Sequence, residues 1–138
     1  MLSLLNEKAQ AAKISNLKTF LHDLRDGPIK ESRFDVILCA MTMHHVQDTD
    51  ILLQCFCSML EPNGFLAIAD LDKEDGSFHD DPTGVEHHGF CRDQLVGKMM
   101  NSGLTLVSME TVHQFEKTSS NGPRRYPVFF ATGRKRVS

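Results

Sequence analysis

Two apolar runs constrain the fold of this chain most: FDVILCA at residues 34–40 and FLAIADL at residues 65–71. Apart from Asp35, the first run is apolar on both faces, as is the second, which is typical of strands covered by helices on each side. Residues 49–60 between them have the pattern of a buried helix, which Asp48 can cap and EPNG ends, because proline cannot continue a helix. A strand, a helix and a strand in this order predict a βαβ unit with parallel strands and a right-handed crossover.

The sequence on either side extends this unit into an α/β sheet. An amphipathic pattern in the first twelve residues predicts a helix, and the apolar residues 17–21 predict a further strand. A helix is expected over residues 92–101. Residues 104–117 and 126–135 then predict two strands of an antiparallel hairpin, joined by the turn TSSNGPR. The expected fold is therefore a mainly parallel sheet with helices on both faces and a C-terminal antiparallel hairpin.

Composition narrows the classes of function. With 138 residues, 41% hydrophobic and 24% charged, the chain is expected to form a single domain over residues 1–138. A net charge of -3 gives no broad positive field, which argues against nucleic acid and membrane partners. Glu7 and Lys8 interrupt the region where a signal peptide would be apolar, so a cytoplasmic protein is expected, and its four cysteines are expected to be buried free thiols.

Polar residues follow each predicted strand. In open parallel sheets, ligands bind outside the carboxyl ends of the strands. Asp23 follows the first predicted strand, His44 and His45 follow the second, and Asp70 ends the third. The histidine pair therefore either faces a ligand or merely begins the next helix, with its polar atoms satisfied by the backbone.

These residues carry a family resemblance. The stretch FDVILCAMTMHHVQDTDILLQCFCSMLEPNGFLAIADL resembles the fourth strand, following helix and fifth strand of class I S-adenosylmethionine-dependent methyltransferases, especially the type 11 or type 12 group. The shared features are F-D-x-I, the H-H pair, a helix ending in L-x-P-x-G, and a strand closing on Asp70. The remaining chain is also similar, which implies a partial Rossmann-like methyltransferase sheet whose last strand lies antiparallel beside the fifth.

The resemblance implies S-adenosylmethionine as the cofactor and assigns five residues to its site. Asp23 would contact the adenine amino group with Leu24 beside the ring, while Ala40, Met41 and His44 would border the methionine end. The plainer alternatives are that Asp23 is an ordinary loop residue and Met41 an ordinary core residue.

Methyl transfer is expected to need a base when the acceptor atom carries a proton. Five histidines cluster at the expected ligand edge, and His45 and His79 are favoured as catalytic. By elimination, the acceptor is expected to be a small molecule, in a pocket that Phe78, Phe90 and the hairpin turn could line.

The chain also departs from the family. The glycine-rich turn that cradles the cofactor is not found among its nine glycines, so it looks like the C-terminal two thirds of a methyltransferase domain with half the cofactor site missing. Either the sequence is truncated, or the gap is closed by direct strand pairing or by a homodimer formed through exposed sheet edges.

Two other classes of function stay open. The segment 72–88 is rich in ligand-type side chains, which suggests a divalent-metal site, although H-x7-H-H matches no defined template and an acidic solvated loop is the plainer interpretation. Its members are Asp72, Asp75, His79, Asp80, Asp81, Glu86, His87 and His88. The other class is a noncatalytic module for dimerisation or interaction with a partner.

Overall fold

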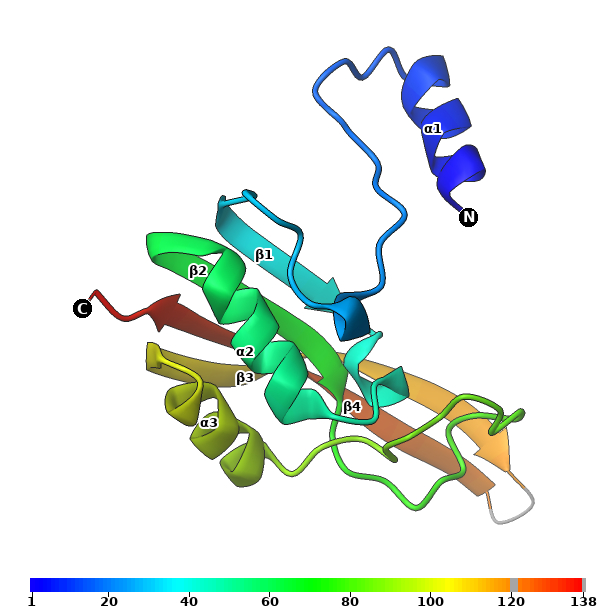
Figure 1. The fold of residues 1–138 in the computed structure, drawn as a ribbon. Helices are drawn as coiled ribbons and strands as arrows, with labels where there is room; N and C mark the ends of the chain where they lie inside the picture. Colours follow the sequence, from blue (N-terminus) through cyan, green and yellow to red (C-terminus); the bar gives the residue numbers. More distant parts are fainter. Residues whose placement is uncertain (120–121, 138) are drawn as a thin grey trace.

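A computed structural model of the chain describes residues 1–119 and 122–137. Its centre is one mixed four-stranded sheet with the order β1-β2-β4-β3 (Figure 1). The strands are β1 (Phe34–Ala40), β2 (Leu60–Leu71), β3 (Leu104–Ser119) and β4 (Gly122–Lys135). The helical elements of the described residues are α1 (Leu2–Ala11), η1 (Leu24–Asp26), η2 (Met43–His45), α2 (Thr49–Met59) and α3 (Arg92–Asn101).

The βαβ unit is confirmed. β1 and β2 are neighbours and run parallel, with Ile37 opposite Leu66, and α2 connects them. The helix begins as expected, because the Asp48 side chain accepts a hydrogen bond of 3.0 Å from the backbone N–H of Ile51. Both strands therefore deliver their carboxyl ends to the same edge of the sheet.

The end of α2 differs from the prediction. The helix stops at Met59 and β2 begins at once, so EPNG lies inside the strand. Gly64 explains why, since a Cβ atom there would lie 2.8 Å from the carbonyl oxygen of Glu61 and 3.0 Å from that of Asp35. Glycine therefore lets the start of β2 approach β1 at the irregular register between Phe34 and Val36.

The C-terminal hairpin is also confirmed. β3 and β4 pair antiparallel along almost their whole length, and β4 pairs antiparallel with β2. The last strand therefore lies between β2 and β3, which is the order that the family resemblance implies. Of the expected turn TSSNGPR, residues 120 and 121 lie outside the described residues.

The prediction of a strand over residues 17–21 is wrong. This segment is extended but has no hydrogen-bonded neighbour strand, and its Leu17, Phe20 and Leu21 side chains are exposed. Apolar residues alone do not make a strand, because the ladder needs a partner for its backbone groups. Among the strands of the described residues, β1–β2 is therefore the one parallel pair. Figure 1 shows α1 standing apart from the sheet, at the far end of this segment.

The described helices do not cover both faces of the sheet as expected. Figure 1 shows α2 and α3 together in front of it, and the core lies between them and the sheet. Along β1, Ile37 and Cys39 face this core, while Val36 and Leu38 point the other way and are 60% and 64% exposed. The described part of the chain contains no helix that is long and apolar enough to cross a membrane.

Candidate active site

The carboxyl ends of β1 and β2 are hydrogen-bonded to each other, and a tight turn begins directly after β1. Ala40 pairs with Ala69, and the N–H of the next residue, Met41, donates a hydrogen bond of 2.7 Å to the Ala69 carbonyl. Met41 has a φ of +50°, the left-handed region that turns the chain sharply away from the strand. The half-buried Met41 side chain packs against the cluster that contains Leu71, while Ala40 is exposed. Ala40 and Met41 therefore lie at the carboxyl edge of the strand pair.

Asp70 and His44 form a buried pair behind the turn. The Asp70 side chain is fully buried, and its Oδ1 lies 2.7 Å from Nδ1 of His44, which is 2% exposed. Asp70 also accepts hydrogen bonds from the backbone N–H groups of His44 (3.2 Å) and Leu71 (2.8 Å). A buried carboxylate is tolerated because its oxygens are hydrogen-bonded in this way. Asp70 therefore fixes both the backbone and the ring of His44.

The sequence-based reasoning missed this role of Asp70. The apolar pattern places Asp70 at the end of a strand and predicts no buried carboxylate in the site. The signal was a carboxylate inside the apolar run FLAIADL, because burying such a group is costly unless a donor is close.

His45 is held by the long loop that follows β2. It is exposed, and its Nδ1 lies 2.8 Å from the carbonyl oxygen of Gly84. The same loop is tied to η2 by the N–H groups of Glu86 and His87, which donate hydrogen bonds of 2.9 and 3.0 Å to the His44 carbonyl. The loop is therefore docked onto the turn that carries the histidine pair.

His79 completes a cluster of three imidazoles. Its ring centroid lies 4.8 Å from that of His44 and 5.8 Å from that of His45, and the His44 and His45 rings are 4.1 Å apart. Burial lowers the pKa of His79 below its usual value, and the neighbouring His44 and His45 lower it further. The structure thus brings both sequence-predicted catalytic residues together with His44.

The two phenylalanines expected to line the acceptor pocket have different surroundings. The Phe78 ring lies 4.9 Å from that of His79 and packs against Phe115 and Tyr126 of the hairpin. Phe90 instead packs against the main core, with its ring 6.4 Å from that of Phe129. Of the two, Phe78 is therefore the one beside the histidine cluster.

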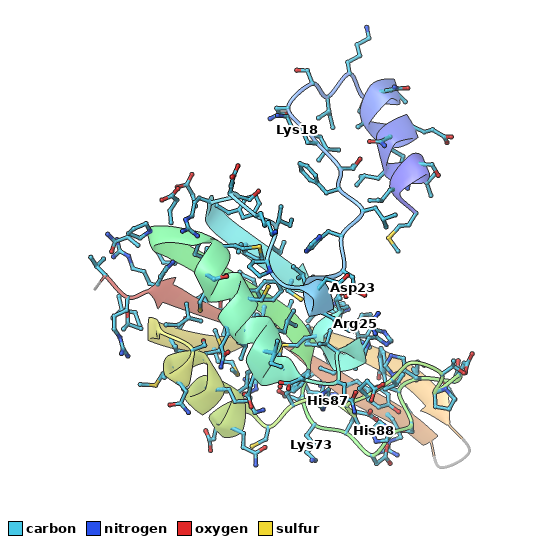
Figure 2. All side chains as sticks on the ribbon, viewed as in Figure 1. Lys18, Asp23, Arg25, Lys73, His87 and His88 are labelled. Carbon is cyan, nitrogen blue, oxygen red and sulfur yellow. The ribbon has the colours of Figure 1, made fainter. Side chains whose placement is uncertain are left out.

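Asp23 and Leu24 lie at the same end of β1, where Figure 2 shows Asp23 beside Arg25. Asp23 caps η1 and accepts hydrogen bonds from the Arg25 guanidinium at 2.5 to 3.0 Å. This hydrogen bonding lowers the pKa of Asp23 to about 2, so the carboxylate is ionised at neutral pH. Leu24 is half-buried against the core.

The acidic loop does not assemble the metal site that its sequence suggested. Asp72 is paired with Arg92 at 2.7 Å, Asp75 with Arg124, and Asp80 with Lys117 at 3.7 Å. These acids therefore lie beside three different cations. Asp81 accepts a hydrogen bond from the Thr83 N–H, within the turn that contains both residues.

The other loop histidines also point elsewhere. The Nε2 atom of His87 lies 2.8 Å from the carbonyl oxygen of Val46, and His88 is exposed beside Gly76. Only His79 of the suggested set joins the imidazole cluster found in the described residues.

An apolar cavity of about 340 Å³ lies on the other side of η1, beside the first half of β1 and the end of α2. It is lined by Phe20, His22, Leu24, Ile29, Phe34, Val36, Ile37, Phe56 and Met59. None of the three clustered histidines lines it. The residues with candidate chemistry therefore form an open edge of the sheet rather than the wall of this cavity.

Comparisons with curated proteins agree with this arrangement. An uncharacterized methyltransferase of Schizosaccharomyces pombe is 32% identical to the chain over 82 residues, which cover 54% of this chain and 29% of that protein. Methyltransferase GfsG of Streptomyces halstedii is 31% identical over 120 residues, covering 78% of this chain and 42% of that protein. The chain thus spans less than half the length of the curated relatives it matches.

Solved structures share the fold. The YcgJ protein of Bacillus subtilis matches all of this chain and 79% of its own, with a TM-score of 0.73 at 13% identity. Phosphoethanolamine N-methyltransferase 2 of Haemonchus contortus, solved with S-adenosyl-L-methionine, matches 75% of this chain and 34% of its own, with a TM-score of 0.56 at 13% identity.

A family model settles the relationship. The model for the methyltransferase domain matches residues 3–114, which include β1, α2, β2 and the three clustered histidines. The chain therefore belongs to the methyltransferase domain family.

Proposed function

We propose that this chain supports methyl transfer from S-adenosylmethionine to a small-molecule acceptor at the carboxyl edge of β1 and β2. The observation that carries this proposal is the methyltransferase-domain match over residues 3–114, within which the parallel strand pair brings Met41 and the histidine cluster to one edge. A neighbour with the same fold was solved with this cofactor, and its name identifies a small phosphorylated amine as its substrate.

The residues at the edge suit the adenosyl part of the cofactor. The Asp23 carboxylate is the acceptor that the adenine amino group would use, and this group would share or displace the contacts that Arg25 makes with both of its oxygens. Leu24 offers an apolar contact beside it. Ala40, Met41 and His44 border the turn where the methionine part would lie.

The same edge can serve the acceptor. Bound cofactor supplies a methyl group on a sulfonium sulfur, so the protein has to align the acceptor and keep water out. When the acceptor carries a proton, a neutral imidazole nitrogen of His45 or His79 accepts that proton as the acceptor–methyl bond forms. Burial favours the neutral form of His79, because it lowers the pKa of that side chain.

Calorimetric titration with S-adenosylmethionine and S-adenosylhomocysteine tests the proposal. We expect saturable binding by the chain, weakened about tenfold in Asp23→Asn, because the loss of one charge-assisted hydrogen bond costs about 1.5 kcal/mol. Asp26→Asn is the matched control in the same turn and should bind like the parent chain. Equal binding by all three proteins would remove Asp23 from the site, and no binding by any of them would argue against the proposed activity.

A second candidate function is pairing with another copy of this chain. β1 is an edge strand of the described sheet, and its outward residues Val36 and Leu38 are more than half exposed. Such an edge presents unpaired backbone groups that an identical strand can match about a two-fold axis. Sedimentation should then show a dimer that Val36→Lys weakens, whereas a strict monomer at high concentration would exclude it.

A further inference from the structure

The three-histidine cluster suggests a property that methyl transfer does not require. One ring nitrogen from each of His44, His45 and His79 lies within 4.8 Å of the others. Two of these residues come from the turn after β1, and the third comes from the loop after β2. We infer that His44, His45 and His79 form a binding site for a zinc-type divalent metal ion.

Hydrogen bonds define which nitrogen of two rings is free to bind. The carbonyl oxygen of Gly84 can only accept a hydrogen bond, so Nδ1 of His45 must carry a proton and donate it. The Asp70 carboxylate, which also accepts from two backbone N–H groups, likewise receives the Nδ1 proton of His44. In both neutral rings the lone pair is therefore on Nε2.

This arrangement is the one that metal-binding histidines usually show. A ligating imidazole donates its other N–H to a carboxylate or a backbone carbonyl, which fixes the ring and makes it a better ligand. Asp70 plays this part for His44, and the Gly84 carbonyl plays it for His45. The outer contacts of a metal site are therefore formed by residues already in place.

The rings need only a small movement to bind an ion. Zn–N bonds of about 2.0 to 2.1 Å in tetrahedral geometry place the ligand nitrogens about 3.4 Å apart. The observed limit of 4.8 Å leaves a closure of a little over 1 Å. This closure would fall on His45 and His79, since Asp70 holds His44 in place.

An acidic side chain of the same loop interacts with the cluster. Glu74 acts electrostatically on His79, and its Oε1 atom is the one buried side-chain oxygen without a hydrogen-bond partner among the described residues. A divalent ion held by His79 would add a favourable charge partner for this carboxylate, whose Oε2 atom accepts hydrogen bonds from the Gly76 and Phe78 N–H groups.

The ligand type indicates which ions fit. Three imidazoles suit zinc, cobalt or a similar transition ion, whereas magnesium and calcium prefer oxygen ligands, and the loop carboxylates Asp72 and Asp75 are paired with arginines. Three protein ligands leave a fourth position open for water or another oxygen ligand. With an ion bound, His45 and His79 could not also accept a proton, because both roles use the same lone pair.

The test is a calorimetric titration of the metal-free chain with Zn²⁺, repeated by visible absorption with Co²⁺, in the absence of any methyl donor. We expect uptake of about one ion per chain and a tetrahedral cobalt spectrum. His45→Asn and His79→Asn should each weaken binding by at least about tenfold, since even outer contacts of a metal site are worth about 10- to 100-fold.

His88→Asn is the matched control. It removes an exposed imidazole of the same loop and should leave metal affinity and the cobalt spectrum unchanged. Thermal unfolding without metal shows whether each variant is folded. No saturable uptake by the parent chain, or parent-like uptake by folded His79→Asn and His45→Asn, would overturn the inference. Because no cofactor is present, this outcome is independent of whether S-adenosylmethionine binds.

Discussion

Replacing Asp70 by asparagine tests whether the buried Asp70–His44 pair holds the site together. In the parent chain, Oδ1 of Asp70 accepts from His44 Nδ1 and the Leu71 N–H, and Oδ2 accepts from the His44 N–H. Asparagine has the same shape but only one acceptor oxygen. If that oxygen replaces Oδ1, the amide nitrogen faces the His44 N–H, so two buried donors meet without an acceptor between them.

The size of the effect follows from these contacts. One hydrogen bond to a charged group is lost, and a buried donor is left unsatisfied, each worth about 1 to 3 kcal/mol. We therefore expect the free energy of unfolding to fall by about 3 kcal/mol. For a domain of this size, about 4 °C per kcal/mol corresponds to a Tm about 12 °C lower.

The assay is urea and thermal unfolding followed by circular dichroism, with Asp35→Asn as the matched control. Asp35 is exposed on the neighbouring strand, so its replacement should change stability by no more than about 0.5 kcal/mol. The reasoning would be refuted if Asp70→Asn were as stable as Asp35→Asn. An unchanged environment of the His44 ring, measured by its NMR shifts, would refute it equally.

Three further predictions concern the loop and the Asp23 turn. Gly89→Ala should destabilise the fold by more than about 2 kcal/mol in urea unfolding, because Gly89 has a φ of +70° and an added Cβ would lie 2.1 Å from the Asp72 carbonyl oxygen. Acidification should destabilise the parent chain more than it destabilises the His79→Asn variant. The pKa of His79 in the folded chain lies below its usual 6.5, so the stability that the neutral ring contributes above pH 6.5 is lost as the pH falls through the folded-state pKa. NMR titration of Arg25→Ala should show the pKa of Asp23 rising from about 2 toward 3.8, since the Arg25 hydrogen bond is the largest cause of its lowering; an unchanged value would contradict this.

The sequence predicted the elements whose pattern depends on local periodicity. The βαβ unit and the hairpin follow from apolar runs and an Asp48 cap, and the strand pairs and the cap agree with the structure. The segment 17–21 has the same apolar character but forms no strand, because strand formation depends on a neighbour that local sequence does not reveal.

The candidate site could be predicted only in part from the sequence. Placing His44 and His45 at a strand end needed only the order of elements, and His79 was selected by residue type. Their convergence depends on the loop docking onto η2 through the Glu86 and His87 N–H groups, which no periodic pattern encodes. The pairing of Asp23 with Arg25 was equally hidden, because it arises from the geometry of a three-residue turn.

The most direct measurement is an NMR titration of the isotope-labelled chain with S-adenosylhomocysteine, following every backbone amide. The proposed function predicts that the largest shifts occur at Asp23, Met41 and His44, where η1 and the ends of β1 and β2 meet. Shifts confined to β3 and α3, or no saturable shifts in a folded chain, would contradict a cofactor site at the carboxyl edge of the parallel pair.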